Sequence, residues 1–380
     1  MIYFDNASTT KPFNSVIEEM NSFNSEYFFN PSALYKEGLA VNRIIDGARE
    51  VVANKLGVAS EELYFTSSAT EANNWALLNG IKNKKGNVVI SQGEHASIFE
   101  CGNLLRSRGI EVRWVTLKKD GTIDLNDLEN KVDEYTALSS IIHVSNETGA
   151  INDIKLASNI IKNKNPNTLF HADGAAAFCK ISNFNNIMRD INRVNWLDFY
   201  TISAHKVCGP KGIGALYINK NRTIAPLIVG GGQERGQRSG TENTAAIIGF
   251  AQAVKDFSLT SSNMIKEIHD YLKNSLMKCG WMHNGSEINT GYILSLSNPK
   301  IKAEILMRLL SEEGVLIGLG SACANKLSQN RVLSALGATK TQIEGSIRLS
   351  FCPTNTIDEA KIALSKIIKL QKILEGKLIK

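Results

Sequence analysis

One segment of the chain joins an apolar strand to a cationic turn, and it reads Phe199-Tyr200-Thr201-Ile202-Ser203-Ala204-His205-Lys206-Val207-Cys208-Gly209-Pro210-Lys211-Gly212. Its first residues are β-branched and aromatic, which favours a strand, and its last four are typical of a turn. A lysine that follows a strand can serve as an amine nucleophile. Because most lysines are only surface charges, the role of Lys206 depends on the residues that accompany it.

Short apolar runs of the same kind recur on both sides of this segment. Between about residues 60 and 220 they alternate with longer helical patterns, at Leu63–Thr66, Val88–Ser91, Val112–Leu117, Ile141–Val144, Leu169–Ala172, Phe199–Ser203 and Gly214–Ile218. Parallel neighbouring strands need crossover connections, which are usually helices. The alternation therefore predicts an α/β fold with a mostly parallel sheet, and it places the functional site at the ends of the strands.

The helical patterns predict where one domain ends and another begins. Apolar spacing predicts helices at 36–56 and 243–257, and the turn-like residues 258–263 precede a new helical stretch at 264–277. The rest of the chain has the pattern of an α+β unit, with a strand at 291–296, a helix at 303–310, a glycine-rich loop at 314–325 and a helix from 357. We expect a large α/β domain over 14–258 and a small α+β domain formed by 1–13 and 259–380.

Composition excludes several classes of protein. The chain has 380 residues, of which 43% are hydrophobic and 21% charged, so it is neither disordered nor collagen-like. Its net charge of +6 comes from scattered residues, and the longest basic cluster is Lys82-Asn83-Lys84-Lys85, so we expect no direct binding of nucleic acid. No apolar run approaches the ~20 residues that span a bilayer, and the N-terminus lacks the pattern of a signal peptide.

The cysteines and histidines indicate a reducing environment and no metal site. Six cysteines lie far apart, without a C-x-x-C pair or the density of a disulfide-rich domain, so we expect a cytoplasmic protein. No spacing of histidine and cysteine matches a metal site. Five of the cysteines are expected to be ordinary core or surface thiols, namely Cys101, Cys179, Cys208, Cys279 and Cys352.

A carboxylate closes one of the predicted buried strands. Asp173 directly follows Leu169–Ala172, where an unpaired charge would be costly unless a cation lies opposite. A protonated pyridine nitrogen is such a cation. The alternatives are that Asp173 caps a helix or pairs with an arginine.

Two segments could bind an anion. Ser68-Ala69-Thr70-Glu71 lies where a strand turns into a helix, which suits either a phosphate or a plain helix cap. The segment from Gly230 to Asn243 combines glycines, Arg235, Arg238 and a threonine before a helix, and is a second candidate. Neither is a Walker A loop or a Rossmann fingerprint, so nucleoside triphosphates and dinucleotides are disfavoured as ligands.

Motifs spread over nearly the whole length resemble those of NifS/IscS-type cysteine desulfurases, which are pyridoxal-phosphate (PLP) enzymes of the class V aminotransferase group. The resemblance is carried by Tyr3 to Thr10, Asn30-Pro31-Ser32, Ala69 to Asn74, Glu94-His95, Asn146 to Gly149, His171-Ala172-Asp173, Ser203 to Lys206, Arg235 to Asn243, Gly320 to Cys323 and Ser346 to Ser350. It implies the PLP-dependent transferase fold type I, with a mostly parallel seven-stranded sheet in the large domain.

The resemblance also implies a role for each matching position. Lys206 would hold PLP as a Schiff base, Asp173 would keep the pyridine nitrogen protonated, and His95 would stack on the ring and shuttle protons. The phosphate would be held by Thr70, Ser203 and His205, and by Thr241 of a partner subunit in a homodimer. Asn146 and Arg348 would orient L-cysteine, and Asn146 would also contact the cofactor. Cys323 would take the sulfur as a persulfide, with its thiolate favoured by Lys326 or His95, and pass it to an acceptor protein.

The chain departs from the family pattern at several positions. Ala176 stands where a glutamine usually donates a hydrogen bond to the phenolic oxygen of the cofactor, and alanine cannot donate one. Ser68, Ser145, Asn152 and Tyr35 also replace the usual residues. This divergence suits a desulfurase that serves one pathway, such as DNA phosphorothioation, tRNA thiolation or Fe–S assembly.

Two other functions remain open at this point. A selenocysteine lyase or a small aminotransferase would keep Lys206 and Asp173 without needing Cys323. A PLP-binding protein with weak or partner-dependent turnover is the other alternative, and Ala176 is the reason to consider it.

Overall fold

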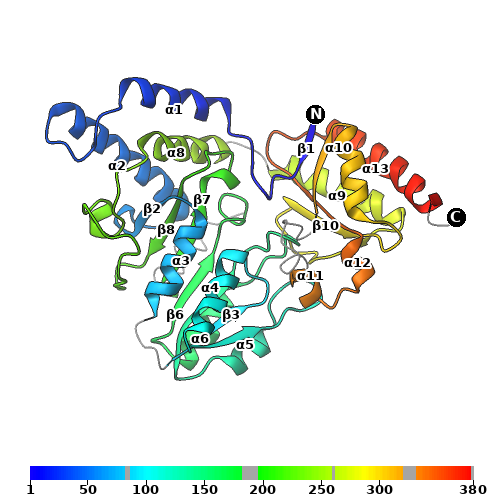
Figure 1. Ribbon diagram of the computed structural model, residues 1–380, viewed down its shortest axis with the longest axis horizontal. Helices are drawn as coiled ribbons and strands as arrows, with labels where there is room; N and C mark the ends of the chain where they lie inside the picture. Colours follow the sequence, from blue (N-terminus) through cyan, green and yellow to red (C-terminus); the bar gives the residue numbers. More distant parts are fainter. Residues whose placement is uncertain (82–85, 182–195, 259–261, 320–330, 378–380) are drawn as a thin grey trace.

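The computed structural model describes residues 1–81, 86–181, 196–258, 262–319 and 331–377. Within these ranges the chain forms two sheets with helices packed around them, and the two sheets lie side by side in Figure 1. None of the described helices is both long enough and apolar enough to cross a membrane.

The larger sheet has seven strands in the order β2-β8-β7-β6-β5-β3-β4. Their bounds are β2 Leu63–Thr66, β3 Asn87–Ser91, β4 Glu111–Val115, β5 Thr136–Ile142, β6 Leu169–Asp173, β7 Phe199–Ser203 and β8 Gly214–Ile218. Only β8 runs against its neighbours, β2 and β7, and the remaining pairs are parallel. The predicted mostly parallel, seven-stranded sheet is therefore confirmed.

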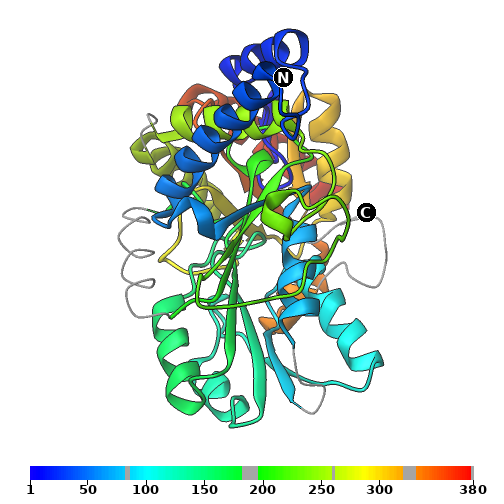
Figure 2. The ribbon, with the colours of Figure 1, turned by 90° about the vertical axis from the view of Figure 1, so that its left-hand side faces the viewer.

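Helices cover both faces of this sheet, because successive side chains on each strand point to opposite faces. Phe199 of β7 packs in a cluster with residues of α3 (Ala69–Gly80) and α4 (Ala96–Ser107). The next residue, Tyr200, packs in a second cluster that draws on α2 (Lys36–Leu56), α5 (Leu125–Lys131), α6 (Ile154–Lys164) and α8 (Thr244–Ser258). Figure 2 shows α4 (cyan) on one side of the sheet and the green helices α5 and α6 on the other.

The smaller sheet has five strands in the order β1-β11-β12-β10-β9. They are β1 Ile2–Phe4, β9 Met282–His283, β10 Ile293–Ser297, β11 Val315–Leu319 and β12 Ser346–Ser350. β1 pairs in parallel with β11, so the N-terminus belongs to the same sheet as the C-terminal third of the chain. The helices of this region are α9 Ser262–Lys278, α10 Ala303–Glu312, α11 Arg331–Ala335, α12 Lys340–Glu344 and α13 Ile357–Lys377.

The remaining elements are short or lie outside the two sheets. Helix α1 (Asn14–Glu26) packs near α8, and three 3₁₀ turns occur at η1 Ser60–Glu62, η2 Ala204–Lys206 and η3 Glu234–Gly236. The predicted helix at 36–56 has the same bounds in the structure, and the helix predicted at 243–257 is shifted by one residue. The turn-forming Gly57 ends α2 at a φ of 79°, a conformation that glycine adopts without strain.

Two predicted elements need correction. The strand expected at Ile141–Val144 corresponds to β5, which spans Thr136–Ile142 and so begins and ends earlier than predicted. The polar residues Ser139 and Ser140 belong to this strand and are fully buried in the sheet. The loop expected at 314–325 is wrong for residues 315–319, which form β11, and its residues 320–325 lie outside the described ranges. Position 318 in this strand requires glycine, because a Cβ there would come within 2.6 Å of the Asp5 carboxylate.

Candidate active site

Lys206 lies in η2, directly after the end of β7, where the sheet positions it among polar groups from distant parts of the chain. Its ammonium Nζ donates to the carbonyl oxygens of Ala7 (2.6 Å) and Ser8 (2.9 Å). Burial lowers the pKa of Lys206 from 10.5 to about 8, with help from the positive charges of Lys180 and Arg348. The amine is therefore easier to deprotonate than an ordinary lysine, which is what a nucleophile needs.

Asp173 is the last residue of β6 and is 3% exposed. Its carboxylate accepts hydrogen bonds from the side-chain amide of Asn73 (2.8 Å) and from the backbone N–H of Ala175 (2.9 Å). Among the described residues no arginine bonds to Asp173, which contradicts the alternative of an arginine pair for this part of the chain. Because both of these donors are neutral, they do not balance the buried charge of Asp173, and a protonated ligand nitrogen could do so.

His95 caps the N-terminus of α4 and is linked to Asp173 through neutral groups. Its Nδ1 lies 2.8 Å from the Ser97 hydroxyl and accepts from the Ser97 N–H (3.2 Å). The Asn73 amide bridges onward, donating to the Ser97 hydroxyl (2.9 Å) as well as to Asp173. Burial lowers the pKa of His95, so the ring is neutral at neutral pH with its proton on Nε2.

Glu94 is a fully buried carboxyl beside these groups. It accepts from the backbone N–H of Ile142 (2.6 Å), and its second oxygen has no hydrogen-bond partner among the described residues. Burial and the nearby charge of Asp173 raise its pKa well above the ordinary value, so Glu94 is harder to ionise than an ordinary glutamate. Sequence reasoning placed Asn73 and Glu94 in motifs but assigned them no role, since only the fold brings them to Asp173.

A cavity of about 260 Å³ lies next to Lys206, and its lining is polar and small: Ser8, Thr9, Ser67, Ser68, Ser203, His205, Lys211, Gly212 and Ile213. The hydroxyl of Ser203 is buried with no partner among the described residues, so it can still bond to a ligand. Ser68 caps α3 by accepting from the N–H of Glu71 (3.2 Å), which places the helix N-terminus at this cavity. Such a helix end favours an anion.

The predicted phosphate ligands meet this cavity only in part. Ser203 and His205 line it, whereas Thr70 is exposed on the first turn of α3 and is absent from the lining. Burial and the charge of Lys206 lower the pKa of His205 to about 4, so His205 offers a neutral ring rather than a cation. Lys211 and Ser67 are lining residues that sequence reasoning missed, although Lys211 stands in the same segment as Lys206.

Arg348 lies in β12 and is 6% exposed. Its guanidinium donates to Asp5 (3.0 Å), to the hydroxyl of Ser8 (2.8 Å) and to the backbone carbonyl of Asn146 (3.0 Å), and it lies 3.5 Å from the Glu147 carboxylate. The structure thus brings the two predicted substrate-binding residues, Asn146 and Arg348, together. It also shows that two carboxylates of the chain already occupy the arginine.

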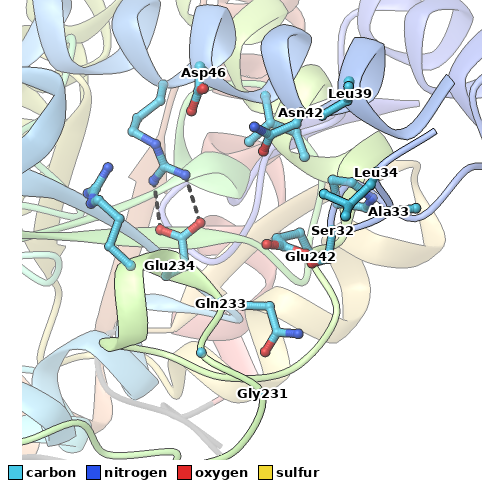
Figure 3. Close-up of a pocket in the computed structure, with 15 residues that line it drawn as sticks. Ser32, Ala33, Leu34, Leu39, Asn42, Asp46, Gly231, Gln233, Glu234 and Glu242 are labelled. Carbon is cyan, nitrogen blue, oxygen red and sulfur yellow. Dashed lines mark hydrogen bonds and ion pairs between the residues drawn. The ribbon is translucent and has the colours of Figure 1, made fainter. Parts of the chain in front are cut away.

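The segment from Gly230 to Asn243 borders a different cavity, of about 510 Å³, against α2 (Figure 3). At its wall Arg49 forms a two-pronged ion pair with Glu234, at 2.6 and 2.8 Å. The arginines expected in an anion cradle are engaged by the protein, because Arg238 pairs with Glu71 and Arg235 donates to a backbone carbonyl. Thr241 is exposed on this segment and lies outside the lining of both cavities.

Two sequence-predicted residues, Cys323 and Lys326, lie outside the described residues. Ala176, the position of the missing glutamine, is buried at 8% exposure within the apolar core. The structure brings most of the remaining predicted site residues together. The charges of Asp173 and Lys206 act on His95, and Ser203 and His205 line one cavity. Arg348 bonds to Ser8, as Lys206 does, and also to the backbone of Asn146.

Known proteins resemble this chain over nearly its whole length. Residues 2–362 match the aminotransferase class-V family. The cysteine desulfurase IscS of Clostridium botulinum is 35% identical, covering 98% of this chain and 95% of that protein. The corresponding protein of Methanosarcina thermophila is 33% identical, covering 99% and 93%.

Solved structures agree with the sequence relatives. A NifS-like protein has a TM-score of 0.90 at 35% identity, covering 98% of this chain and 100% of that one. A structure described as SspA in complex with cysteine has a TM-score of 0.81 at 31% identity, covering 93% and 99%. This chain is therefore a member of the class-V aminotransferase family, within the group of NifS/IscS-type cysteine desulfurases.

Proposed function

We propose that this chain is a PLP-dependent cysteine desulfurase. It converts L-cysteine to L-alanine, takes the sulfur as a persulfide on Cys323 and passes it to an acceptor protein. The observation that carries the proposal is that Lys206, whose pKa is lowered to about 8, lies within electrostatic reach of the buried Asp173 and of His95, and that its neighbour His205 lines a cavity with the unsatisfied hydroxyl of Ser203. The similarity to cysteine desulfurases, and to a protein solved with cysteine, supports the choice of substrate.

The residues present fit PLP. The orphaned Ser203 hydroxyl and the N-terminus of α3 suit its phosphate, and both border the cavity that is also lined by His205, the residue before Lys206. Asp173, which accepts only from neutral donors, suits the protonated ring nitrogen. When bound, PLP supplies an electron-withdrawing ring that makes the bonds at the substrate's Cα easier to break.

The residues of the chain would then have separate roles in catalysis. Lys206 offers a neutral amine near pH 8, and His95, with an unprotonated nitrogen, can accept and return a proton. Arg348 offers a planar pair of N–H donors to the substrate carboxylate, a geometry that an ammonium lacks. Asn73 and Ser97 hold Asp173 and His95 in a fixed relation to each other.

Turnover and persulfide formation test the proposal directly. The full chain, loaded with PLP and given L-cysteine and a reductant, should form alanine and sulfide in equal amounts. Cys323→Ser should abolish sulfide formation, whereas Cys279→Ser, which changes a thiol outside the site, should leave it unchanged. Sulfide release that survives Cys323→Ser would point instead to a selenocysteine lyase or an aminotransferase with a side activity.

One observation favours partner-dependent turnover. Asp5 and Glu147 already pair with Arg348, so a substrate carboxylate has to compete with carboxylates of the chain. Slow turnover that rises when an acceptor protein is added would agree with this arrangement. A yellow protein that forms no alanine with any acceptor would instead be a cofactor-binding scaffold.

The homodimer is also part of this proposal. Exposed apolar side chains surround the cavity that borders the segment carrying Thr241, among them Leu34 (88% exposed) and Val229 (78% exposed). Exposed patches of this kind are typical of interfaces between subunits. Thr241 would then reach the phosphate of the partner subunit, and sedimentation of the purified protein would test the dimer.

The remaining parts of the proposal concern domains, location and pathway. The pairing of β1 with β11 supports a small domain of 1–13 and 259–380 beside a large domain of 14–258. The described cysteines are free thiols, which supports the expected cytoplasmic location. The pathway that receives the sulfur is one of those named above, and identifying the acceptor that removes the Cys323 persulfide would decide among them.

A further inference from the structure

Two cysteines that are distant in sequence meet at the junction of the two sheets. Cys208 follows Lys206 by two residues, and Cys352 follows Arg348 by four. Their thiols are hydrogen-bonded to each other, with Cys208 as the donor. Both side chains are buried, at 0% and 4% exposure, and both are free thiols in the structure.

The backbone holds both cysteines in place. Cys208 has a φ of 58°, a left-handed conformation that is rare for a residue with a side chain. Its N–H donates to the Thr10 hydroxyl (2.8 Å), and its carbonyl accepts from the Phe13 N–H (3.1 Å). The N–H of Cys352 donates to the side-chain oxygen of Asn355 (2.9 Å). The backbone of each cysteine is therefore held in place while their side chains are in contact.

The surroundings act on the two thiols in opposite directions. The S–H of Cys208 and the Thr354 hydroxyl (3.0 Å) lower the pKa of Cys352. The same contact and burial raise the pKa of Cys208. A thiolate therefore forms more readily on Cys352 than on Cys208.

Charged and titratable groups also face the pair. The ammonium of Lys180 adds a positive charge that favours the thiolate. Lys180 itself lies 5.5 Å from the centre of the Tyr292 ring. Cys179, Tyr3 and Tyr292 are the other titratable neighbours, and burial raises the pKa of each, so all three are neutral at neutral pH. The local field therefore stays positive around Cys352.

We propose that Cys208 and Cys352 are a reversible dithiol–disulfide pair that peroxide oxidises. The Cys352 thiolate attacks one oxygen of hydrogen peroxide, the O–O bond breaks, and a water molecule leaves after protonation, so that Cys352 becomes a sulfenic acid. The Cys208 sulfur then attacks the Cys352 sulfur; the S–S bond forms and the S–O bond breaks, and the thiol proton leaves with the hydroxide as a second water. Two thiols lose two electrons, which the peroxide takes up, and a dithiol reductant reverses the change.

The disulfide would connect two parts of the site that lie in different sheets. It would tie the turn that carries Lys206 to the strand end that carries Arg348, and it would close the chain between residues 208 and 352. A cross-link over such a long stretch restricts the unfolded chain strongly, so the oxidised protein should unfold at a higher temperature than the reduced one. Formation of the cross-link does not depend on the proposed desulfurase activity.

The test uses the full chain with Cys323→Ser, which removes the thiol expected to react first and makes the result independent of turnover. After treatment with hydrogen peroxide, free thiols are blocked under denaturing conditions and the protein is digested without reductant. Mass spectrometry should find the Cys208 and Cys352 peptides joined, with the loss of two hydrogen atoms, and dithiothreitol should separate them. The oxidised protein should also show the higher unfolding temperature.

Matched variants decide the assignment. Cys208→Ala and Cys352→Ala should each abolish the joined peptide and the change in unfolding temperature, whereas Cys101→Ala and Cys279→Ala should keep both. The rate of oxidation should rise with pH, because the thiolate fraction of Cys352 rises and the thiolate is the nucleophile.

The proposal is overturned if Cys208 and Cys352 both remain free for blocking after a treatment that oxidises Cys279. It is also overturned if Cys179 replaces one of them in the joined peptide. Should Cys208→Ala fail to fold, Cys208→Ser and Cys352→Ala carry the same comparison, and a joined peptide in either would contradict the assignment.

Discussion

Two cations of the candidate site, Lys206 and Arg348, are contacted in different ways by the same N-terminal segment. Among the described residues, Lys206 donates to the neutral backbone carbonyls of Ala7 and Ser8. Arg348 meets the carboxylates of Asp5 and Glu147. Within this part of the chain, Lys206 has no directly bonded carboxylate and Arg348 has two.

This difference matches two chemical tasks. Without a bonded carboxylate, burial lowers the pKa of Lys206 to about 8, and the residue becomes available as a neutral amine. Arg348 keeps its charge under all ordinary conditions and needs carboxylates to be stable when buried. The lysine is therefore suited to act as a nucleophile and the arginine to bind a carboxylate, although each side chain carries a single positive charge when protonated.

The largest expected effect comes from removing the amine of Lys206. Lys206→Ala should reduce alanine formation by more than ~10³-fold and abolish the visible absorbance of bound PLP, since no other amine occupies this position. Lys206→Arg is the matched control, because it keeps a cation but offers no neutral amine. If either variant kept visible absorbance and near-normal turnover, the proposed roles of the two cations would be wrong.

Replacing Arg348 should have a smaller effect, and it should change KM rather than the binding of PLP. Arg348→Lys keeps the charge and loses the planar pair of donors, so KM for L-cysteine should rise ~10- to 100-fold, in line with about 1.5–3 kcal/mol for hydrogen bonds to a charged group. The absorbance of bound PLP should persist. Steady-state kinetics with a spectrum of each variant makes the test, and an unchanged KM would remove Arg348 from the substrate site.

The pH dependence of cofactor uptake should report the pKa of Lys206. Below pH 8 the uptake rate of the apoprotein should rise about tenfold per pH unit, because the fraction of neutral amine rises in that proportion, and it should level off above pH 8. Arg348→Met removes a charge that lowers this pKa, so its midpoint should move to higher pH. A midpoint near 10.5 in the wild type would show that burial does not act on Lys206 in this way.

The smallest effect concerns Ala176, which is neither of the two cations. A glutamine there restores a donor that the family usually has, so Ala176→Gln should shift the pH at which the visible absorbance of bound PLP changes. The matched control is Ala176→Leu, which adds volume to this core position without a donor. Equal titrations in Ala176→Gln and the wild type would mean that another group already supplies the hydrogen bond.

Most of the larger sheet was predictable from local pattern. β-branched and aromatic runs such as Phe199–Ser203 marked the strands, and apolar spacing marked the helix at 36–56, because both signals lie within one element. The start of β5 was misjudged because serines such as Ser139 and Ser140 are usually exposed, and β11 was misjudged because Gly318 and the glycines flanking the strand are typical of a loop. In both cases neighbours that are distant in sequence decide what is buried.

The candidate site divides in the same manner. Residue type and position drew attention to Lys206 and Asp173, since nucleophilic and ion-pairing chemistry belongs to the side chain itself, whereas Arg348 was predicted only from the resemblance to the family. The bridge from Asp173 to His95 through Asn73, the pairing of Asp5 with Arg348 and the meeting of Cys208 with Cys352 needed the tertiary structure. The pKa of a group and the identity of its partners depend on burial and on distances across the fold, and neither quantity is encoded in spacing along the chain.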